Sequence, residues 1–209
     1  MRVLVTGAYG FIGSQITARL LADGHEVIGA GRRVAEAARR WPNVRWVAID
    51  FAQSTRPEDW LPHLAGVDAL VNCVGILQDT PGNSTRGVHV DGTRALFAAC
   101  ARAGVRRIVH LSAIGVEKNR PTAFSRTKRE ADEALMALPV DWVILRPSVV
   151  VGRSAYGGSA LFRALAALPW VLPVMPDSGE LQIVQVDDLA GTVAFFLAAD
   201  APARRAVEV

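Results

Sequence analysis

Short apolar segments alternate with helix-like segments along most of the chain. The apolar segments are rich in β-branched residues and lie at 1–7, 25–31, 44–50, 67–75, 106–112 and 140–147. They are apolar along nearly their whole length, which is typical of strands buried on both faces. Segments with helical spacing lie between them, most clearly at 11–22, 85–102 and 122–138. The alternation predicts an α/β fold: a Rossmann-type doubly wound parallel sheet covered by helices on both faces.

The pattern changes after about Val151. We expect residues 1–151 to form a dinucleotide-binding core and residues 152–209 to form a small C-terminal substrate lobe interleaved with it. Within the lobe we expect a short helix at 159–169 and a later helix capped by Asp187 or Asp188. The final RRAVEV predicts one more strand, and the chain stops there, which fits either a truncation at Val209 or a natural end.

A glycine-rich loop, TGAYGFIG, follows the first strand and opens the first helix. Gly7 suits a tight turn, Gly10 allows a pyrophosphate to approach the backbone, and Gly13 lets helix and strand pack closely. In this strand–turn–helix context the spacing predicts a dinucleotide site, with the phosphates at the helix N-terminus. A purely structural turn is the alternative. The loop residues assigned to the cofactor are Gly7, Tyr9, Gly10, Phe11, Ile12 and Gly13.

The end of the second strand indicates which cofactor binds. NAD-binding proteins carry an acidic residue there for the ribose hydroxyls, whereas this chain has Gly31 followed by Arg32 and Arg33. A guanidinium can bind a 2′-phosphate through two hydrogen bonds. We therefore expect NADP(H) to be preferred, with NAD(H) as the other candidate. Two solvated arginines at a helix start are the alternative. Asp50, at the end of the third strand, is placed either to contact the adenine or to cap a turn.

Composition excludes several other classes of protein. The net charge is only +3 although the pI is about 9.3, and no nucleic-acid-binding motif accompanies the arginine cluster, so no nucleic-acid partner is expected. No apolar run reaches the roughly twenty residues needed to span a bilayer. Cys73 and Cys100 lie in apolar runs and predict buried thiols in a reducing, cytoplasmic setting. The histidines lack metal-ligand spacing, so we expect no metal site.

Several further segments resemble the short-chain dehydrogenase/reductase superfamily, in its extended (NAD-dependent epimerase/dehydratase-like) and atypical branches. TGAYGFIG resembles that family's TGxxGxxG loop, HVDGTRAL its NVxGTxNL helix, and VQVDDLA its VHVDDVA segment. The wording of HLSAIG and DWVILRPSVV is most similar to an atypical group that resembles the nucleotide-binding accessory subunit of respiratory complex I. The resemblance implies that the cofactor is also contacted by Asp50, Phe51, Cys73, Val74, Gly75, Pro147, Ser148 and Val149.

The family's active site is YxxxK with an upstream serine or threonine, and here it is altered. The match in this chain is FxxxK, with Phe124 at the usual tyrosine position and Lys128 at the lysine that holds the nicotinamide ribose. Ser112 is the candidate upstream hydroxyl, although Ala113 is an alternative occupant of that position. The resemblance implies that Lys128 contacts both the cofactor and the reacting groups.

Two functions fit these residues. The first is an NADP(H)-dependent oxidoreductase of atypical type, whose proton comes from water, substrate, Ser112 or Tyr156. The second is a non-catalytic NAD(P)(H)-binding module, such as a stabilising subunit or redox sensor, that lacks the catalytic tyrosine. The apolar stretch 168–175 predicts either lobe core or the wall of a pocket for a lipophilic small-molecule substrate, such as a quinone. The sequence leaves the substrate and the oligomeric state open.

Overall fold

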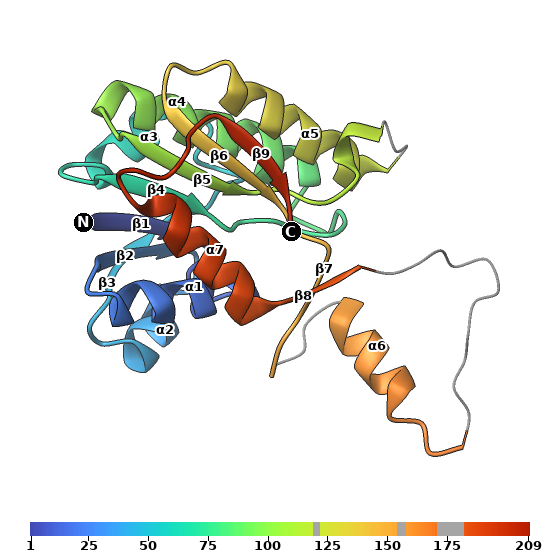
Figure 1. Ribbon diagram of the computed structural model, residues 1–209. Helices are drawn as coiled ribbons and strands as arrows, with labels where there is room; N and C mark the ends of the chain where they lie inside the picture. The colour runs from blue at the N-terminus through green and yellow to red at the C-terminus, as the bar shows by residue number, and fades with distance from the viewer. Residues whose placement is uncertain (119–121, 154–157, 171–181) are drawn as a thin grey trace.

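A seven-stranded, wholly parallel sheet forms the centre of the protein. The computed structural model describes residues 1–118, 122–153, 158–170 and 182–209. Its main sheet has the strand order β3-β2-β1-β4-β5-β6-β9 (Figure 1). The strands are β1 (Arg2–Thr6), β2 (Glu26–Gly31), β3 (Arg45–Ala48), β4 (Ala69–Asn72), β5 (Arg107–Leu111), β6 (Asp141–Arg146) and β9 (Arg205–Glu208). This confirms the predicted Rossmann-type fold.

Helices cover both faces of the sheet. One face carries α1 (Phe11–Ala22), α2 (Val34–Arg40) and α7 (Val186–Leu197). The other carries α3 (Pro57–Trp60), α4 (Gly92–Ala103) and α5 (Ala123–Met136), with short helical turns at Leu61–His63 and Val116–Lys118. The strand order reverses between β1 and β4, and ligands of open α/β sheets bind at the carboxyl ends of the strands beside such a reversal.

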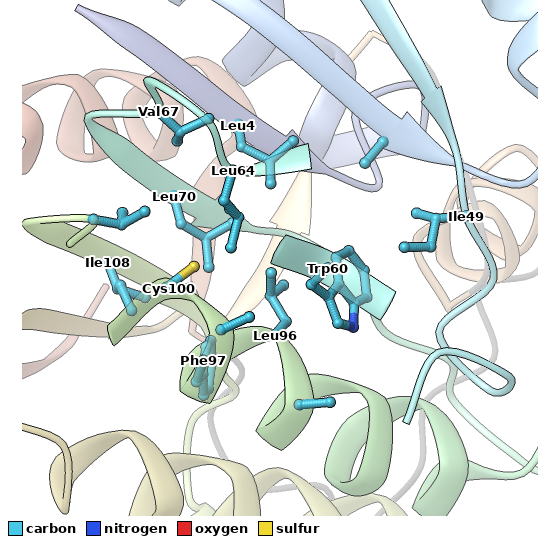
Figure 2. Close-up of a cluster of buried hydrophobic side chains, with 14 of the residues drawn as sticks. Leu4, Ile49, Trp60, Leu64, Val67, Leu70, Leu96, Phe97, Cys100 and Ile108 are labelled. Carbon is cyan, nitrogen blue, oxygen red and sulfur yellow. The ribbon is translucent and has the colours of Figure 1, made fainter. Parts of the chain in front are cut away.

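Each face of the sheet has its own apolar core. Beneath α3 and α4, Trp60, Leu96 and Phe97 are fully buried against Leu70 and Ile108 of the strands (Figure 2). On the opposite face, side chains of α1 and α7, including Ile16 and Val193, pack on alternate residues of the same strands. Two buried faces explain why the strands are apolar throughout rather than alternating.

The predicted helix at 85–102 is interrupted. Gly87–Asp91 forms one π-helical turn, and α4 follows from Gly92. The Thr93 hydroxyl donates a hydrogen bond to the Val88 carbonyl (2.9 Å), which satisfies a group within the widened turn. Such π-bulges are frequent at functional sites. Sequence periodicity does not register a single extra residue, so the prediction missed the break.

The C-terminal part returns to the core. β9 pairs in parallel with β6, and α7 packs against α1, so both belong to the Rossmann layers. Outside these layers lie a two-stranded sheet of β7 (Val149–Val151) and β8 (Ile183–Gln185) and the helix α6 (Gly158–Ala166). The prediction that Asp187 or Asp188 caps α7 is wrong, because Gln185 is the N-cap and both acids lie in the first turn.

Two predicted features fall wholly or partly outside the described residues. Of the apolar stretch 168–175, the structure describes only Leu168 to Trp170, and the Trp170 side chain is 92% exposed. Tyr156, the candidate alternative proton donor, lies outside the described residues.

Candidate functional site: a dinucleotide cleft at the carboxyl ends of the strands

The three glycines of the loop have different physical roles. Gly7 has φ +66°, a left-handed conformation that favours glycine. A Cβ at Gly13 would collide with the Gly7 carbonyl, so Gly13 allows α1 to pack against the turn. At Gly10, which is exposed, an added Cβ would meet only one atom within 4 Å, the Gly7 oxygen at 3.1 Å. The fold therefore does not need glycine at position 10, and the space there suits a pyrophosphate.

A cavity of about 230 Å³ lies beside this loop. It is formed where β1, β2, β3 and β4 end. Of the predicted cofactor residues it is lined by Gly7, Tyr9, Arg32, Arg33, Asp50, Phe51, Cys73, Val74 and Gly75. Gly31, Ile49, Ile76, Asn83 and Val88 complete the lining. Asn83 comes from a loop far along the chain, so no local sequence pattern identifies it.

Arg32, Asp50 and Phe51, which are expected near the adenosine, all line the cavity. Arg32 donates from Nη1 to Oδ1 of Asn83 (2.6 Å), which links the β2–α2 turn to the distant loop. The Asp50 carboxylate accepts a hydrogen bond from the Ala52 N–H (3.0 Å), so it caps the turn after β3 while also lining the cavity. Phe51 is buried and packs edge-on against Trp60. It therefore contributes backbone and ring surface rather than a polar contact.

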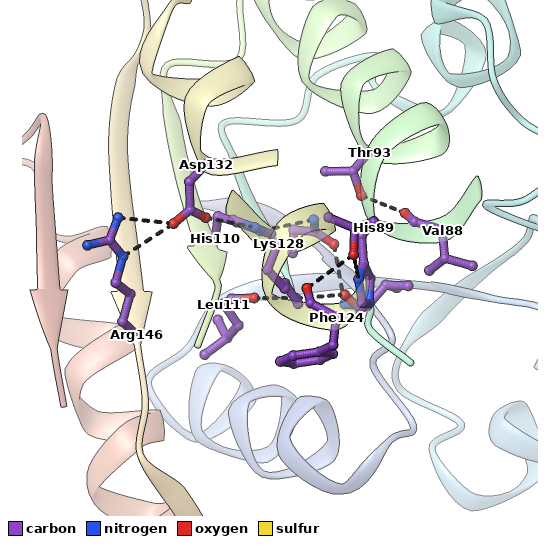
Figure 3. Close-up of polar contacts among 12 residues, drawn as sticks. Val88, His89, Thr93, His110, Leu111, Phe124, Lys128, Asp132 and Arg146 are labelled. Atoms are coloured by element: carbon purple, nitrogen blue, oxygen red, sulfur yellow. Dashed lines mark hydrogen bonds and ion pairs between the residues drawn. The ribbon is translucent and has the colours of Figure 1, made fainter. Parts of the chain in front are cut away.

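Lys128 is buried beside Gly75, which lines the cavity, although the lysine itself does not. Its Nζ donates to the carbonyl of Leu111 (2.8 Å) and to that of Val74 (3.4 Å) (Figure 3). An ammonium has three N–H donors, so one remains that no described residue accepts. A Cβ at Gly75 would lie 3.3 Å from this Nζ, so the glycine keeps open the space beside it. Burial lowers the pKa of Lys128 to about 8, against the opposing effect of Asp132.

His89 joins the loop after β4 to helix α5. Its Nε2 accepts from the Ile76 N–H (2.9 Å), which leaves the proton on Nδ1 to be donated to the Thr127 hydroxyl (2.9 Å). Burial, reinforced by the charge of Lys128, lowers the pKa of His89 to about 3. The ring is therefore neutral at physiological pH, and its two hydrogen bonds hold it in place between the loop and α5.

The groups around the usual proton donor are apolar or enclosed. Phe124 is half-buried, and its ring packs edge-on against His89 with centroids 5.5 Å apart. Ser112 is buried, and burial raises the pKa of Asp132 while a hydrogen bond from the Ser112 side chain opposes that rise. Ala113, by contrast, is half-exposed. Ala113 and Ile114, which reach solvent in this loop, carry no hydroxyl. Burial raises the pKa of Cys73 to about 12, so its thiol is not a nucleophile at neutral pH.

A chain of buried polar side chains lies behind the site. Thr6 donates to Asn72 (2.6 Å), Asn72 bonds His110 (3.1 Å), and the Nε2 of His110 lies 3.6 Å from the Asp132 carboxylate. Arg146 from β6 pairs with Asp132 at 3.2 Å. The spacing of the histidines predicted no metal site, and no sequence pattern singled out Asp132 or Arg146. Asn72 and His110 are polar residues within apolar runs, and this was the sequence pattern that could have indicated a buried polar chain.

The segment expected to line the nicotinamide follows β6. The Pro147 carbonyl accepts from the Ile114 N–H (3.1 Å), the Ser148 N–H donates to the Val209 carbonyl (2.8 Å), and Val149 begins β7. These contacts fix the backbone beside the loop after β5. They do not place the three residues in the lining of the 230 Å³ cavity, and Gly10, Phe11, Ile12, Gly13 and Lys128 also lie outside that lining.

The fold and the glycine loop define a dinucleotide-binding Rossmann protein. Residues 7–161 match the NAD(P)H-binding family, and the chain belongs to that family, within the extended and atypical branch of the short-chain dehydrogenases/reductases. The chain is 30% identical to maize dihydroflavonol 4-reductase, over 98% of this chain and 69% of the reductase. An uncharacterized Mycobacterium tuberculosis protein is 30% identical over 90% of this chain.

The chain spans only 19% of that mycobacterial protein's length. Among solved structures, the dTDP-glucose 4,6-dehydratase of Streptomyces venezuelae, with NAD bound, has a TM-score of 0.79 at 24% identity, covering all of this chain and 75% of the dehydratase. This likeness shows the fold.

Two kinds of feature are absent from the described residues. No described helix combines the length and the apolar character needed to cross a bilayer. Within the same residues, no group of three or more His, Cys, Asp and Glu side chains is arranged to hold a metal ion.

The glycine loop yields a paired prediction. Gly10→Val should abolish detectable cofactor binding while leaving the midpoint of thermal unfolding nearly unchanged, because its side chain enters the phosphate space. Gly13→Val should instead lower that midpoint strongly, since its side chain collides with the Gly7 carbonyl. Circular dichroism melts and calorimetric titration with NADPH would measure both. Retained NADPH affinity in Gly10→Val would show that the pyrophosphate lies elsewhere.

Lys128 yields a pH prediction. If its ammonium holds the cofactor, NADPH affinity should fall as pH rises through about 8, by up to about tenfold per pH unit. The 2′-phosphate, with a pKa of about 6, no longer titrates there.

The stability of the free protein should change in the opposite direction. Because the pKa of Lys128 is lower in the folded state, the unfolded chain holds more protons between about pH 8 and 10.5, and stability rises across that window. Lys128→Met, the control, should lack both trends. A wild-type affinity that is flat from pH 7 to 10 would exclude the ammonium as a contact.

Proposed function

We propose that this chain is an NADP(H)-dependent oxidoreductase domain of the atypical short-chain dehydrogenase/reductase type. The observation that carries the proposal is Lys128. A buried ammonium is costly, on the order of several kcal/mol, unless its donors are satisfied. Here two donors reach the Leu111 and Val74 carbonyls and the third is left for a ligand beside Gly75. The ribose hydroxyls of a bound dinucleotide are suitable acceptors.

The preference for NADP(H) is supported by the end of β2. Arg32 and Arg33 both line the cavity, and Gly31 places no carboxylate there that would repel a 2′-phosphate. Arg33 has no ion-pair partner among the described residues, so its charge is available to an anion. NAD(H) lacks the 2′-phosphate and would gain less from these charges.

The bound nicotinamide would supply or accept the hydride. Lys128 would orient the ribose, and the Pro147–Val149 segment would border the ring. Phe124 offers no proton, and the enclosed Ser112 hydroxyl would need to rotate out of its buried position to reach a substrate. Water or the substrate itself is therefore the proton source that the described residues favour.

The substrate class is proposed from the relatives. The maize protein is a reductase of a dihydroflavonol, and the Streptomyces protein is a dehydratase of a nucleotide sugar. We therefore propose a small molecule with a carbonyl group as the substrate class, because a carbonyl can accept the hydride. The exposed Trp170, within the apolar stretch 168–175, favours a lipophilic substrate. The two cysteines are unpaired, which supports a cytoplasmic setting.

The second candidate function is a non-catalytic NAD(P)(H)-binding module. The observation that favours it is the contact between Phe124 and His89, because the ring at the proton-donor position is held by apolar packing. Such a protein would keep the nucleotide cleft and the lysine but would not turn over. Cofactor oxidation across a panel of carbonyls and quinones would separate the two functions.

Cofactor choice is directly testable. NADPH should bind more tightly than NADH by about 1–3 kcal/mol, the range for hydrogen bonds to charged groups. Arg32→Ala should remove most of that difference, and Arg205→Ala, exposed on β9 and outside the cavity lining, serves as the control. Calorimetric titration of both cofactors provides the measurement. Equal wild-type affinities would exclude the preference, and a loss seen only in Arg33→Ala would assign the contact to the other arginine.

The missing tyrosine gives the test of catalysis. Phe124→Tyr adds one oxygen close to Lys128, whose positive charge should lower the pKa of the new phenol below its reference value of about 10. General acid–base catalysis typically contributes about 10²–10⁴-fold in rate. We expect Phe124→Tyr to gain measurable NADPH-dependent reduction of a reactive diketone and wild type to show little. NADPH consumption measures the gain.

The lysine provides the control for that gain. Adding Lys128→Ala to Phe124→Tyr should abolish the new activity and weaken cofactor binding. A wild type faster than Phe124→Tyr would mean that the chemistry never required a tyrosine. Inactivity of both would favour the binding module.

A further inference from the structure

Tyr9 reaches from the glycine loop to the turn at the end of β2. Its hydroxyl oxygen accepts hydrogen bonds from the backbone N–H groups of Arg32 (3.0 Å) and Arg33 (3.1 Å). On its other side the ring packs at a tilt against Trp46 of β3, with centroids 6.1 Å apart. One side chain thus ties the loop after β1 to the two strands beyond it and fixes the backbone that carries both arginines.

The same ring covers Gly31. An ideal Cβ built at Gly31 would lie 2.5 Å from Cε1 of Tyr9 and 2.9 Å from its hydroxyl oxygen, closer than real Cβ atoms approach. Gly31 does not have a positive φ, so its backbone conformation does not require glycine. The requirement for glycine comes from Tyr9. Any side chain at position 31 must displace the ring and break its two hydrogen bonds.

Position 31 is where a dinucleotide site discriminates between cofactors. A carboxylate at the end of the second strand binds the ribose hydroxyls of NAD, whereas a nearby arginine accommodates the phosphate of NADP. A residue that excludes side chains from this position therefore also excludes the NAD-type carboxylate. In this chain that residue comes from another loop, more than twenty positions earlier in the sequence.

We propose that Tyr9 is a specificity-determining residue that acts through position 31. It keeps the end of β2 free of a carboxylate and holds Arg32 and Arg33 where an adenosine 2′-phosphate would be bound. The inference rests on the proposed NADP(H) preference and assigns its structural cause.

Charge on the far side of the ring supports the proposal. Tyr9 and Arg33 line both the nucleotide cavity and a neighbouring cavity of about 490 Å³, so the ring lies between the two. The second cavity is also lined by Arg39 and Arg40, with Glu36 as its only acidic residue. None of Arg33, Arg39 and Arg40 forms an ion pair within the described part of the chain. The electrostatic potential on that side of Tyr9 is therefore positive and would attract a phosphate group.

A double-mutant cycle tests the steric coupling without any cofactor. Gly31→Asp alone should lower the midpoint of thermal unfolding, because the new side chain displaces the ring. In the Tyr9→Ala background the same substitution should lower the midpoint by less than half as much. Equal decreases in both backgrounds would overturn the proposal, since the two positions would then be independent.

Cofactor titrations test the consequence for specificity. Tyr9→Phe keeps the ring but removes the acceptor of two N–H groups, so NADPH affinity should fall at least threefold more than NADH affinity. Gly31→Asp should bind both cofactors poorly, and Tyr9→Ala with Gly31→Asp should regain at least tenfold in NADH affinity over Gly31→Asp alone. Failure of that recovery would overturn the proposal.

The outcomes separate this inference from the proposed function. A wild type that binds NADPH and NADH equally would refute the cofactor preference, yet the thermal cycle would still report on the contact between Tyr9 and Gly31. A wild type that prefers NADPH, with a ratio unchanged by Tyr9→Phe, would refute only the role of Tyr9.

Discussion

A buried ammonium group holds together the carboxyl ends of the strands that form the site. Lys128 on α5 bonds the Leu111 carbonyl at the end of β5 and the Val74 carbonyl just beyond β4. Leu111 is the last residue of β5, and Val74 lies two residues beyond β4, so both carbonyls lie where the chain leaves the sheet. The lysine supplies a donor to each of them and in return is held in a single position. The width of the cleft at Gly75 depends on this arrangement.

The buried polar side chains behind Lys128 also help to hold the ends of the strands in place. Thr6, Asn72 and His110 are in register across β1, β4 and β5, so their side chains meet in the interior. Asn72 also accepts from the Val74 N–H (3.3 Å), which fixes the second residue of the loop after β4. Asp132, one helical turn after Lys128, counteracts the effect of burial on the lysine and is itself paired with Arg146. The core and the site thus share one electrostatic network.

Within this scaffold, Phe124 stands where the family resemblance expects a tyrosine, and its ring packs against His89. The ring packs on His89, which is neutral and bonded at both nitrogens, so an apolar neighbour there costs no hydrogen bond. Binding and proton transfer are consequently separable in this fold. The groups that would hold a dinucleotide are in place, whereas the group that usually moves the proton is absent from position 124. The same fold can therefore support either an atypical oxidoreductase or a binding module.

The sequence by itself determined the layers of the fold and the nucleotide loop. Apolar strands, helical spacing and glycine positions are local signals, and α1 begins and ends at the predicted residues Phe11 and Ala22. Only the tertiary structure decided which side chains meet across the sheet. The Tyr9–Gly31 contact, the Arg32–Asn83 bond and the pairing of Asp132 with Arg146 join residues whose separation in sequence carries no periodic signal. The π-turn at Gly87–Asp91 and the return of β9 to the sheet also depend on packing. Local propensity gives the elements, but the fit between buried surfaces and the need to satisfy buried polar groups determine how they assemble into a site.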